Sequence, residues 1–361
     1  MTSAPVDGMV EPGFEPVAES FVRGLEKGEL GAAVAAYVDG RKVVDLWGGW
    51  ADAQRTREWK QTTIACTYSS TKGMTATCAH HLADRGLLDV DEPVATYWPE
   101  FGQAGKENVT IRMLLNHQAG RPRPRSLGSG RAMDGSEIAV AKRFDWETMT
   151  SAMAVGTPLW EPGTRCEYHG GEFGYLVGGV IQRIDGRRLG TYFREEIAEP
   201  LGADYLIEVA AEDDHRCAEM TGPEEMVGGA NTREWRAAGD GAATSFGTAD
   251  GLARVYAALS GTGSLDGVRV LRSETIEAAV QEQPLARVPG GGTPGDFGLG
   301  YQLLWKIHPT LPIGSFGHTG IGGSIGLADP GTRLGFGYVM NQMGSNGAAH
   351  LLSAIYRSLA A

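Results

Sequence analysis

The chain has 361 residues, 42% of them hydrophobic and 21% charged, as is typical of a globular protein. Its 32 basic and 44 acidic side chains give a formal net charge of −12, which argues against nucleic acid and anionic membranes as main partners. Fifty-three glycines exclude a helical bundle, and no apolar run approaches the roughly 18 residues of a membrane-spanning helix.

Hydrophobic periodicity predicts helices and strands in a definite order along the chain. Glu15–Glu26 is typical of an amphipathic helix. Residues 31–47 predict a β-hairpin, because two apolar runs flank Asp39-Gly40, the pair that a type I′ turn prefers. Further helices are predicted at Thr71–Leu82, Ile111–His117, Asp145–Ala154, Glu172–Asp185, Thr248–Leu259, Ser273–Gln281 and Gly347–Ala360.

The last third of the chain predicts an antiparallel meander, and with the N-terminal hairpin it indicates an α+β fold in which both ends share one sheet. We expect an α/β domain formed by residues 1–85 and 240–361, a mainly helical domain at residues 86–239, and an active site at their interface. A long irregular loop with four arginines is expected at 120–136. The strands of the meander are predicted at Phe297–Ile307, Phe316–His318, Gly323–Ala328 and Leu334–Asn341.

The sequence offers little evidence for a metal site or for export. The four cysteines form no C-x-x-C pair and no metal-ligand spacing with histidine, which indicates idle thiols in a reducing compartment. His80 and His81 point about 100° apart on a helix, so we expect both to be structural. The N-terminus lacks a basic region followed by an apolar one, so we expect no secretory signal and a cytoplasmic location. We also expect no metal or organic cofactor.

The sharpest motif is S-x-x-K, formed by Ser69 and Lys72 at the start of a predicted helix. The two residues lie one helical turn apart on a shared face, and free N–H groups at the helix start can support developing negative charge. A desolvated lysine can lose its proton and activate a serine. With 17 serines and 7 lysines in the chain, about 0.3 matches arise by chance. On its own, the motif therefore favours a capping serine and an exposed lysine.

Two further elements follow in order: Tyr168-His169-Gly170 precedes a predicted helix, and His318-Thr319-Gly320 stands far downstream. The combined pattern resembles that of the class C β-lactamase and penicillin-binding-protein superfamily of serine hydrolases, and within it the family VIII carboxylesterases. The resemblance covers roughly residues 12 to 358 and implies a β-lactamase/transpeptidase-like fold. It includes the segments Ser69–Gly73, Asp84–Asp89, Tyr97–Phe101 and Leu114–Gly120.

The resemblance implies a role for each of these positions. Ser69 matches the acylated nucleophile, Lys72 the lysine that takes or shares its proton, and Tyr168 the general base of the family's Y-x-N element. The backbone N–H groups of Ser69 and Ile321 match the oxyanion hole. Substrate contacts are also implied for the strand motif His318-Thr319-Gly320. His169, next to Tyr168, is expected either to tune that tyrosine or to line the acyl pocket, with exposed filler as the alternative.

Two departures from the family pattern favour esters over β-lactams. Gly170 replaces the asparagine that orients the acylamino group of a β-lactam, and His318 replaces a lysine, which removes a permanent positive charge. We also expect Gly320, Gly322 and Gly323 to let a substrate lie close to the strand. The acyl and alcohol preferences are expected to depend on residues 120–145, 205–235 and 285–296.

A competing motif lies at Gly322–Gly326, which fits the G-x-S-x-G nucleophile elbow of α/β-hydrolases with Ser324 as nucleophile. That fold requires a helix after the serine and an acid and a histidine further on, each on its own crossover. Only Asp329 and His350 follow, and strand and turn are predicted next. We therefore expect the match to be coincidental.

The sequence thus predicts a serine carboxylesterase that hydrolyses short to medium esters through an acyl-Ser69 intermediate. Alternatives with the same Ser-Lys-Tyr site are an acyltransferase, an amide or lactone hydrolase, or a weak β-lactamase. A binding domain without catalysis is a further alternative, since a fold alone does not fix function. The expected partner is a small-molecule ester, with no nucleic acid and no membrane, and the oligomeric state is open.

Overall fold

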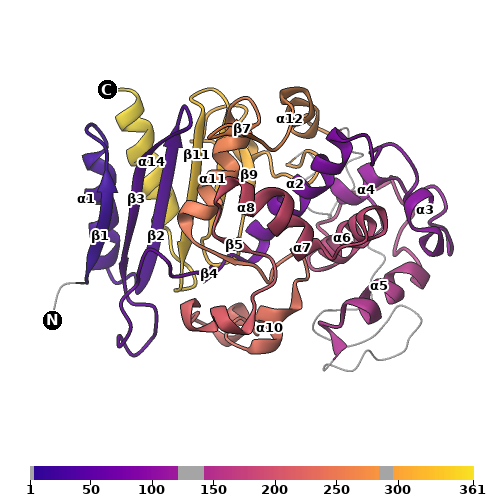
Figure 1. Cartoon of the computed structure of the whole chain (residues 1–361), viewed down its shortest axis with the longest axis horizontal. Coiled ribbons are helices and arrows are strands. Elements are labelled where there is room, and N and C mark those ends of the chain that lie inside the picture. Colours follow the sequence, from indigo (N-terminus) through magenta and orange to yellow (C-terminus); the bar gives the residue numbers. More distant parts are fainter. Residues whose placement is uncertain (1–3, 121–141, 284–295) are drawn as a thin grey trace.

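The computed structural model describes residues 4–120, 142–283 and 296–361. Its main feature is a six-stranded antiparallel sheet in the order β1-β3-β2-β11-β10-β9. The β2–β11 pairing joins the two ends of the chain within this sheet, as predicted (Figure 1). The strands are β1 (Val6–Val10), β2 (Gly31–Val38), β3 (Arg41–Gly49), β9 (Phe316–Thr319), β10 (Ile325–Asp329) and β11 (Leu334–Met340).

The predicted hairpin joins β2 to β3. Asp39 and Gly40 have φ values of 52° and 74°, the left-handed geometry that a type I′ turn requires. Strand β2 is a continuous apolar run because both of its faces are buried: alternate residues enter two different hydrophobic clusters. One cluster receives Ala33, Ala35 and Tyr37, and the other receives Ala32, Val34 and Ala36.

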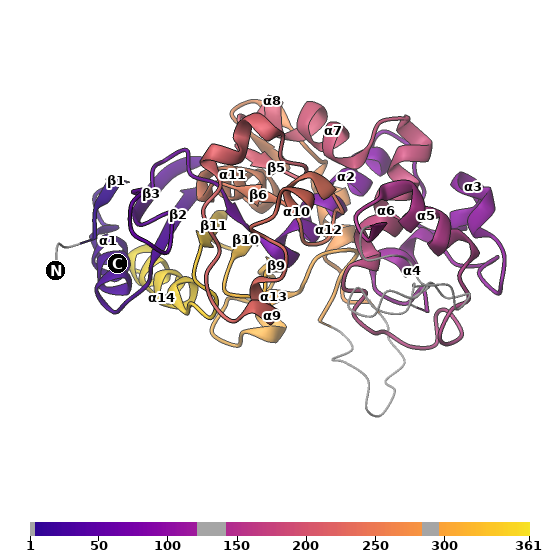
Figure 2. The same ribbon diagram turned by 90° about the horizontal axis from the view of Figure 1, so that it is seen from below.

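Helices cover both faces of the sheet. Helices α1 (Glu15–Glu26) and α14 (Gly347–Leu359) lie side by side on one face, and α11 (Ala249–Ser260) packs on the other (Figures 1 and 2). The close approach of α11 depends on glycine, because a Cβ at Gly335 of β11 would lie 2.3 Å from Ala257 Cα. The bounds of α1 are those predicted, with Val17, Phe21 and Leu25 buried.

The middle of the chain is mainly helical, and α2 (Thr71–Asp84) packs against α6 (Glu172–Asp185) and α7 (Leu189–Phe193) there. A small sheet in the order β4-β6-β5 connects this region to the main sheet: β4 (Ala65–Cys66), β5 (Tyr205–Leu206), β6 (Phe246–Gly247). The remaining elements are η1 (Tyr68–Ser70), α3 (Val94–Tyr97), η2 (Pro99–Phe101), α4 (Ile111–Leu115), α5 (Trp146–Val155), η4 (Arg194–Ala198), α8 (Glu199–Leu201), η5 (Ala211–Arg216), α9 (Glu224–Val227), α10 (Arg233–Ala238), β7 (Ser264–Leu265), β8 (Val268–Arg269), α12 (Ser273–Ala279) and α13 (Leu304–Ile307).

Two segments differ from the prediction. Phe297–Ile307 is not a strand: it bends and ends in the short helix α13, and among the described residues one bridge, between Gln302 and Gly317, joins it to β9. The bend follows from Gly300, whose φ is +85° and where a Cβ would lie 2.5 Å from the Ala76 side chain of α2. Strand β1 was not predicted, because it is largely exposed and has no apolar alternation.

The predicted arginine loop, beyond Gly120, lies outside the described residues. The domain bounds and the cytoplasmic location stay predictions. None of the helices in the described part of the chain has the length and apolarity needed to cross a bilayer. His80 and His81 are structural as expected, because they bond to different partners, Leu299 O at 2.8 Å and the Tyr192 hydroxyl at 2.7 Å.

Candidate active site

Ser69 lies in a tight turn between the small sheet and helix α2. Strand β4 leads into the 3₁₀ turn η1, and α2 begins two residues after Ser69. The preceding residue, Tyr68, has a φ of +45°, which is uncommon for a bulky side chain. Its buried ring packs edge-on against Trp235, and its hydroxyl donates to Val227 O at 3.1 Å. These contacts fix the conformation that presents Ser69 at the start of the helix.

Lys72 lies one turn further and is only 1% exposed, so it is not the exposed lysine of the alternative interpretation. Its Nζ lies 3.5 Å from Ser69 Oγ and donates to Ala242 O at 2.9 Å. Among the described residues it forms no ion pair with a carboxylate. The amine therefore lies next to the Ser69 hydroxyl and can form the serine–lysine pair of an activated nucleophile.

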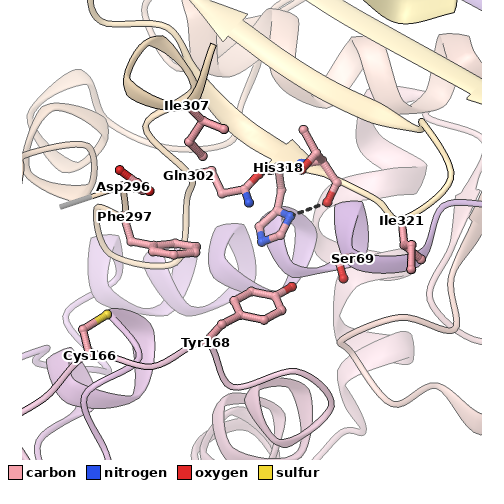
Figure 3. A pocket seen from close by; sticks show the side chains of 10 residues that line it. Ser69, Cys166, Tyr168, Asp296, Phe297, Gln302, Ile307, His318 and Ile321 are labelled. Atoms are coloured by element: carbon pink, nitrogen blue, oxygen red, sulfur yellow. Dashed lines mark hydrogen bonds between the residues drawn. The ribbon is translucent and has the colours of Figure 1, made fainter. Parts of the chain in front are cut away.

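Tyr168 comes from the loop before α6 and approaches Lys72 from the helical region. The centroid of its ring lies 4.9 Å from Lys72 Nζ. The ring also stacks on that of Phe297, with 5.9 Å between the two centroids. The side chain is 36% exposed, and its hydroxyl points toward Ser69 and His318 (Figure 3). Tyr168 can therefore reach both the attacking oxygen and a bound substrate.

His318 of β9 is a buried neutral imidazole beside these groups. Its Nδ1 lies 2.7 Å from Thr319 O; since a carbonyl only accepts, Nδ1 carries the hydrogen and Nε2 keeps a lone pair. Burial, together with the nearby charge of Lys72, lowers the pKa of His318 to about 3. Within the described structure Nε2 has no hydrogen-bond partner, and the Tyr168 ring centroid is 6.2 Å from that of His318.

The β9–β10 turn is attached to the Ser69 segment. Ser324 Oγ donates to Thr67 O at 2.7 Å, and Ser70 Oγ donates to His318 O at 3.1 Å. Ile321 lies in this turn, is 51% exposed, and its N–H donates to no backbone carbonyl of the described residues. Ile321 lines the same cavity as Ser69, so its amide is in the region where a developing oxyanion would need a donor.

The glycines of this turn serve protein packing, so the expectation that they make room for substrate is wrong. A Cβ at Gly320 would lie 2.2 Å from Thr67 O, and one at Gly322 would lie 2.5 Å from Met343 Sδ. At Gly323 the nearest atom would be Ser345 O, at 2.7 Å. These positions are therefore glycine because other segments of the chain pass directly against them.

Ser324 itself is 1% exposed, and the segment after it is strand β10. The elbow motif is therefore coincidental, as predicted. Ser324 is a buried residue whose hydroxyl bonds to the backbone of Thr67, and the helix that a nucleophile elbow requires does not follow it.

His169 does not line the pocket. It is fully buried, its Nδ1 lies 2.6 Å from Glu167 O, and its amide donates to His117 Nδ1 at 3.2 Å. The expectations of pocket lining and of exposed filler are both wrong, because the ring turns inward while its neighbour Tyr168 turns outward. His169 supports the Tyr168 loop from behind, through His117, whose ring is 5.0 Å from that of Tyr168.

Ser69, Tyr168 and His318 meet at a cavity of about 370 Å³ (Figure 3). Of the segments expected to set specificity, 285–296 contributes Asp296, whereas 121–141 and 284–295 lie outside the described residues. The lining residues are Ser69, Cys166, Tyr168, Asp296, Phe297, Gln302, Ile307, His318, Thr319 and Ile321.

Sequence reasoning missed Cys166, Phe297, Gln302 and Ile307. Gln302 Oε1 accepts hydrogen bonds from the amide and the hydroxyl of Thr319, at 2.8 and 3.0 Å, and so orients the end of β9. Burial raises the pKa of Cys166 to about 11, so its thiol stays protonated and is a poor nucleophile.

The described ranges hold no cluster of three or more His, Cys, Asp or Glu suited to a metal ion.

Comparison with known proteins shows the family of the chain. The family model described as "Beta-lactamase" matches residues 14–361. The chain is 33% identical to "Esterase/beta-lactamase LipL" of Mycobacterium tuberculosis, over 94% of this chain and 83% of that protein. A crystal structure of a family VIII carboxylesterase is 38% identical with a TM-score of 0.88, over 98% of this chain and 100% of that one. EstA from Arthrobacter nitroguajacolicus is 30% identical with a TM-score of 0.83, over 98% and 99% of the two chains.

Proposed function

The chain belongs to the beta-lactamase family and is a serine hydrolase of the esterase type, and we propose that it hydrolyses carboxylic esters through an acyl-Ser69 intermediate. The observation that carries this proposal is the 3.5 Å approach of Lys72 Nζ to Ser69 Oγ at the edge of the cavity. It pairs a nucleophile with a buried amine, which an activated serine requires.

In the proposed reaction Ser69 Oγ attacks the ester carbonyl and loses its proton to the Lys72–Tyr168 pair. The amides of Ser69 and Ile321 bind the oxyanion, and each such donor contributes about 10²–10³ in rate. The pair returns the proton to the leaving alkoxide, which departs as the alcohol. Water then attacks the acyl-enzyme with Tyr168 as base, which releases the acid and restores the serine.

Weak β-lactamase activity is the second candidate, because the Mycobacterium tuberculosis relative bears both activities in its name. The neutral His318 and the glycine at 170 favour esters, since neither attracts the carboxylate or the acylamino group of a β-lactam. Rates with p-nitrophenyl acetate, butyrate and octanoate beside nitrocefin separate the two. Faster turnover of nitrocefin than of every ester would reverse the order of the candidates.

Acyl transfer and hydrolysis of amides or lactones would use the same residues. Parallel rates with water, alcohol and amine acceptors separate the transferase from the hydrolase.

Covalent labelling of Ser69 by a fluorophosphonate, measured by intact mass, tests whether the protein only binds its ligand. Labelling would exclude a purely binding role, and a protein that does not label would support a purely binding role.

Replacing Tyr168 with phenylalanine is expected to lower kcat by about 10²-fold, within the range of general acid–base catalysis. The loss is smaller than for Lys72, because Tyr168 makes no hydrogen bond within the described structure, whereas Lys72 lies within 3.5 Å of the hydroxyl. Steady-state rates on p-nitrophenyl butyrate measure the effect. Tyr175→Phe is the control, because it removes the hydroxyl of a tyrosine on the adjacent helix α6 outside the cavity lining, and an equal loss there would point to disruption of this region instead.

His318 is expected to remain neutral from pH 8 down to about 4, because burial and the adjacent Lys72 charge lower its pKa to about 3. It therefore contributes no acid limb to kcat/KM between pH 5 and 8. Imidazole NMR shifts across this range, assigned by the His318→Gln variant, test the expectation. A midpoint between pH 5 and 7 would contradict it.

A further inference from the structure

A second and larger cavity, of about 790 Å³, runs along helix α14. One wall is the helix itself, and the other comprises the segment after α13 and the start of β10. The helical side is open because Ala349 and Ser353, one turn apart, are small. The apolar part of the lining includes Leu311, Ile325, Ala348, Ala349, Leu352 and Tyr356.

This groove adjoins the proposed catalytic cavity. Ile307 and Thr319 line both spaces. The N-terminal end of α14 is held against the β9–β10 turn, because the amide of Ser345 donates to Gly322 O at 3.0 Å. From there the lining continues to Arg357 and Ala360, along the whole 13-residue helix, which is about 20 Å long.

The chemistry of the groove suits an apolar chain. Its described lining contains no aspartate or glutamate, and its one permanent charge is Arg357, near the end remote from Thr319. Arg357 donates to Ser353 Oγ at 2.8 Å and forms no ion pair among the described residues. The lining is therefore mostly carbon, with uncharged polar side chains such as Ser353 between the apolar ones.

We propose that this groove holds an extended apolar chain of the ester substrate while the scissile carbonyl lies at Ser69. The inference rests on the proposed esterase function and names its substrate class: esters with a chain of about eight or more carbons, rather than acetates. Each buried methylene contributes about 0.8 kcal/mol, or about fourfold in kcat/KM. Chain-length preference should therefore persist beyond the four carbons of butyrate.

Two substrate series determine which side of the ester occupies the groove. In one, p-nitrophenyl esters vary the acyl chain from acetate to dodecanoate; in the other, alkyl acetates vary the alcohol. Ala349→Trp and Ser353→Trp fill the groove from an exposed helix face, and His350→Trp is the matched control on the same helix outside the lining. We expect a rise of at least tenfold from four to eight carbons in one series. Ala349→Trp or Ser353→Trp should remove it and His350→Trp should not.

Two results would overturn the proposal: a decline beyond four carbons in both series, or a rise that neither tryptophan in the groove affects. Binding of decanoate to the Ser69→Ala variant, measured by calorimetry with and without Ala349→Trp, tests the groove without turnover. If the wild-type protein hydrolyses no ester and Ala349→Trp still abolishes decanoate binding, the esterase function fails and the groove stands. If acetate is hydrolysed and decanoate does not bind, the groove fails and the esterase stands.

Discussion

Replacement of Ser69 by alanine is expected to lower kcat for p-nitrophenyl butyrate by at least about 10⁴-fold, because the nucleophile of a covalent mechanism cannot be replaced by its neighbours. The substitution removes one partly exposed hydroxyl at the start of α2, whose one side-chain hydrogen bond within the described residues is the 3.5 Å approach of Lys72. Folding should therefore be unchanged, as circular dichroism and thermal unfolding can verify.

Ser324→Ala is the matched control, since Ser324 is the other serine with a nucleophile-like motif. It should retain at least a tenth of the activity and lose stability instead, because Thr67 O would lose its 2.7 Å hydrogen bond, a change of about 1–3 kcal/mol. Should the Ser69→Ala protein keep more than a few per cent of the activity, the acyl-Ser69 mechanism is wrong.

Replacement of Lys72 by methionine is expected to lower kcat by about 10³-fold, the second largest effect. Methionine fills a similar volume but can neither accept the serine proton nor donate to Ala242 O. Lys72→Arg should be nearly as inactive, because a guanidinium keeps its charge yet does not deprotonate. Recovery of more than a tenth of the rate in Lys72→Arg would mean that lysine acts only through its charge.

Lys106→Met controls for the loss of a buried lysine. Lys106 is fully buried as well, but its Nζ donates to the backbone oxygens of Gln103 and Gly156 and is not part of the cavity lining. Its removal should reduce the free energy of unfolding and leave kcat within about threefold. Equal kinetic losses at both lysines would show that buried charge loss, rather than a lost proton acceptor, explains the Lys72 result.

The elements that the sequence predicted well are those with a local physical cause. The apolar stripe of Glu15–Glu26 and the Asp39-Gly40 turn each determine their own geometry within a few residues. Strand β1 and the bend at Gly300 depend on contacts with β3 and with Ala76, which are distant in sequence. No local pattern encodes such contacts.

The same distinction holds for the candidate site. Motif order and family resemblance identified Ser69, Lys72, Tyr168 and His318, and the structure brings these four together. They did not identify Gln302, whose role arises from hydrogen bonds to Thr319. They misassigned His169, because adjacency to Tyr168 does not tell which way a ring turns.

The attachment of the β9–β10 turn to the Ser69 segment has a consequence for synthesis. The hydrogen bond from Ser70 Oγ to His318 O joins two residues that are 248 positions apart in sequence. A ribosome has therefore synthesised most of the chain before the amide of Ile321, the second proposed oxyanion donor, can reach the serine. A nascent or C-terminally truncated chain would carry the serine and the lysine but no complete oxyanion site, so ester turnover would report on completion of the whole polypeptide.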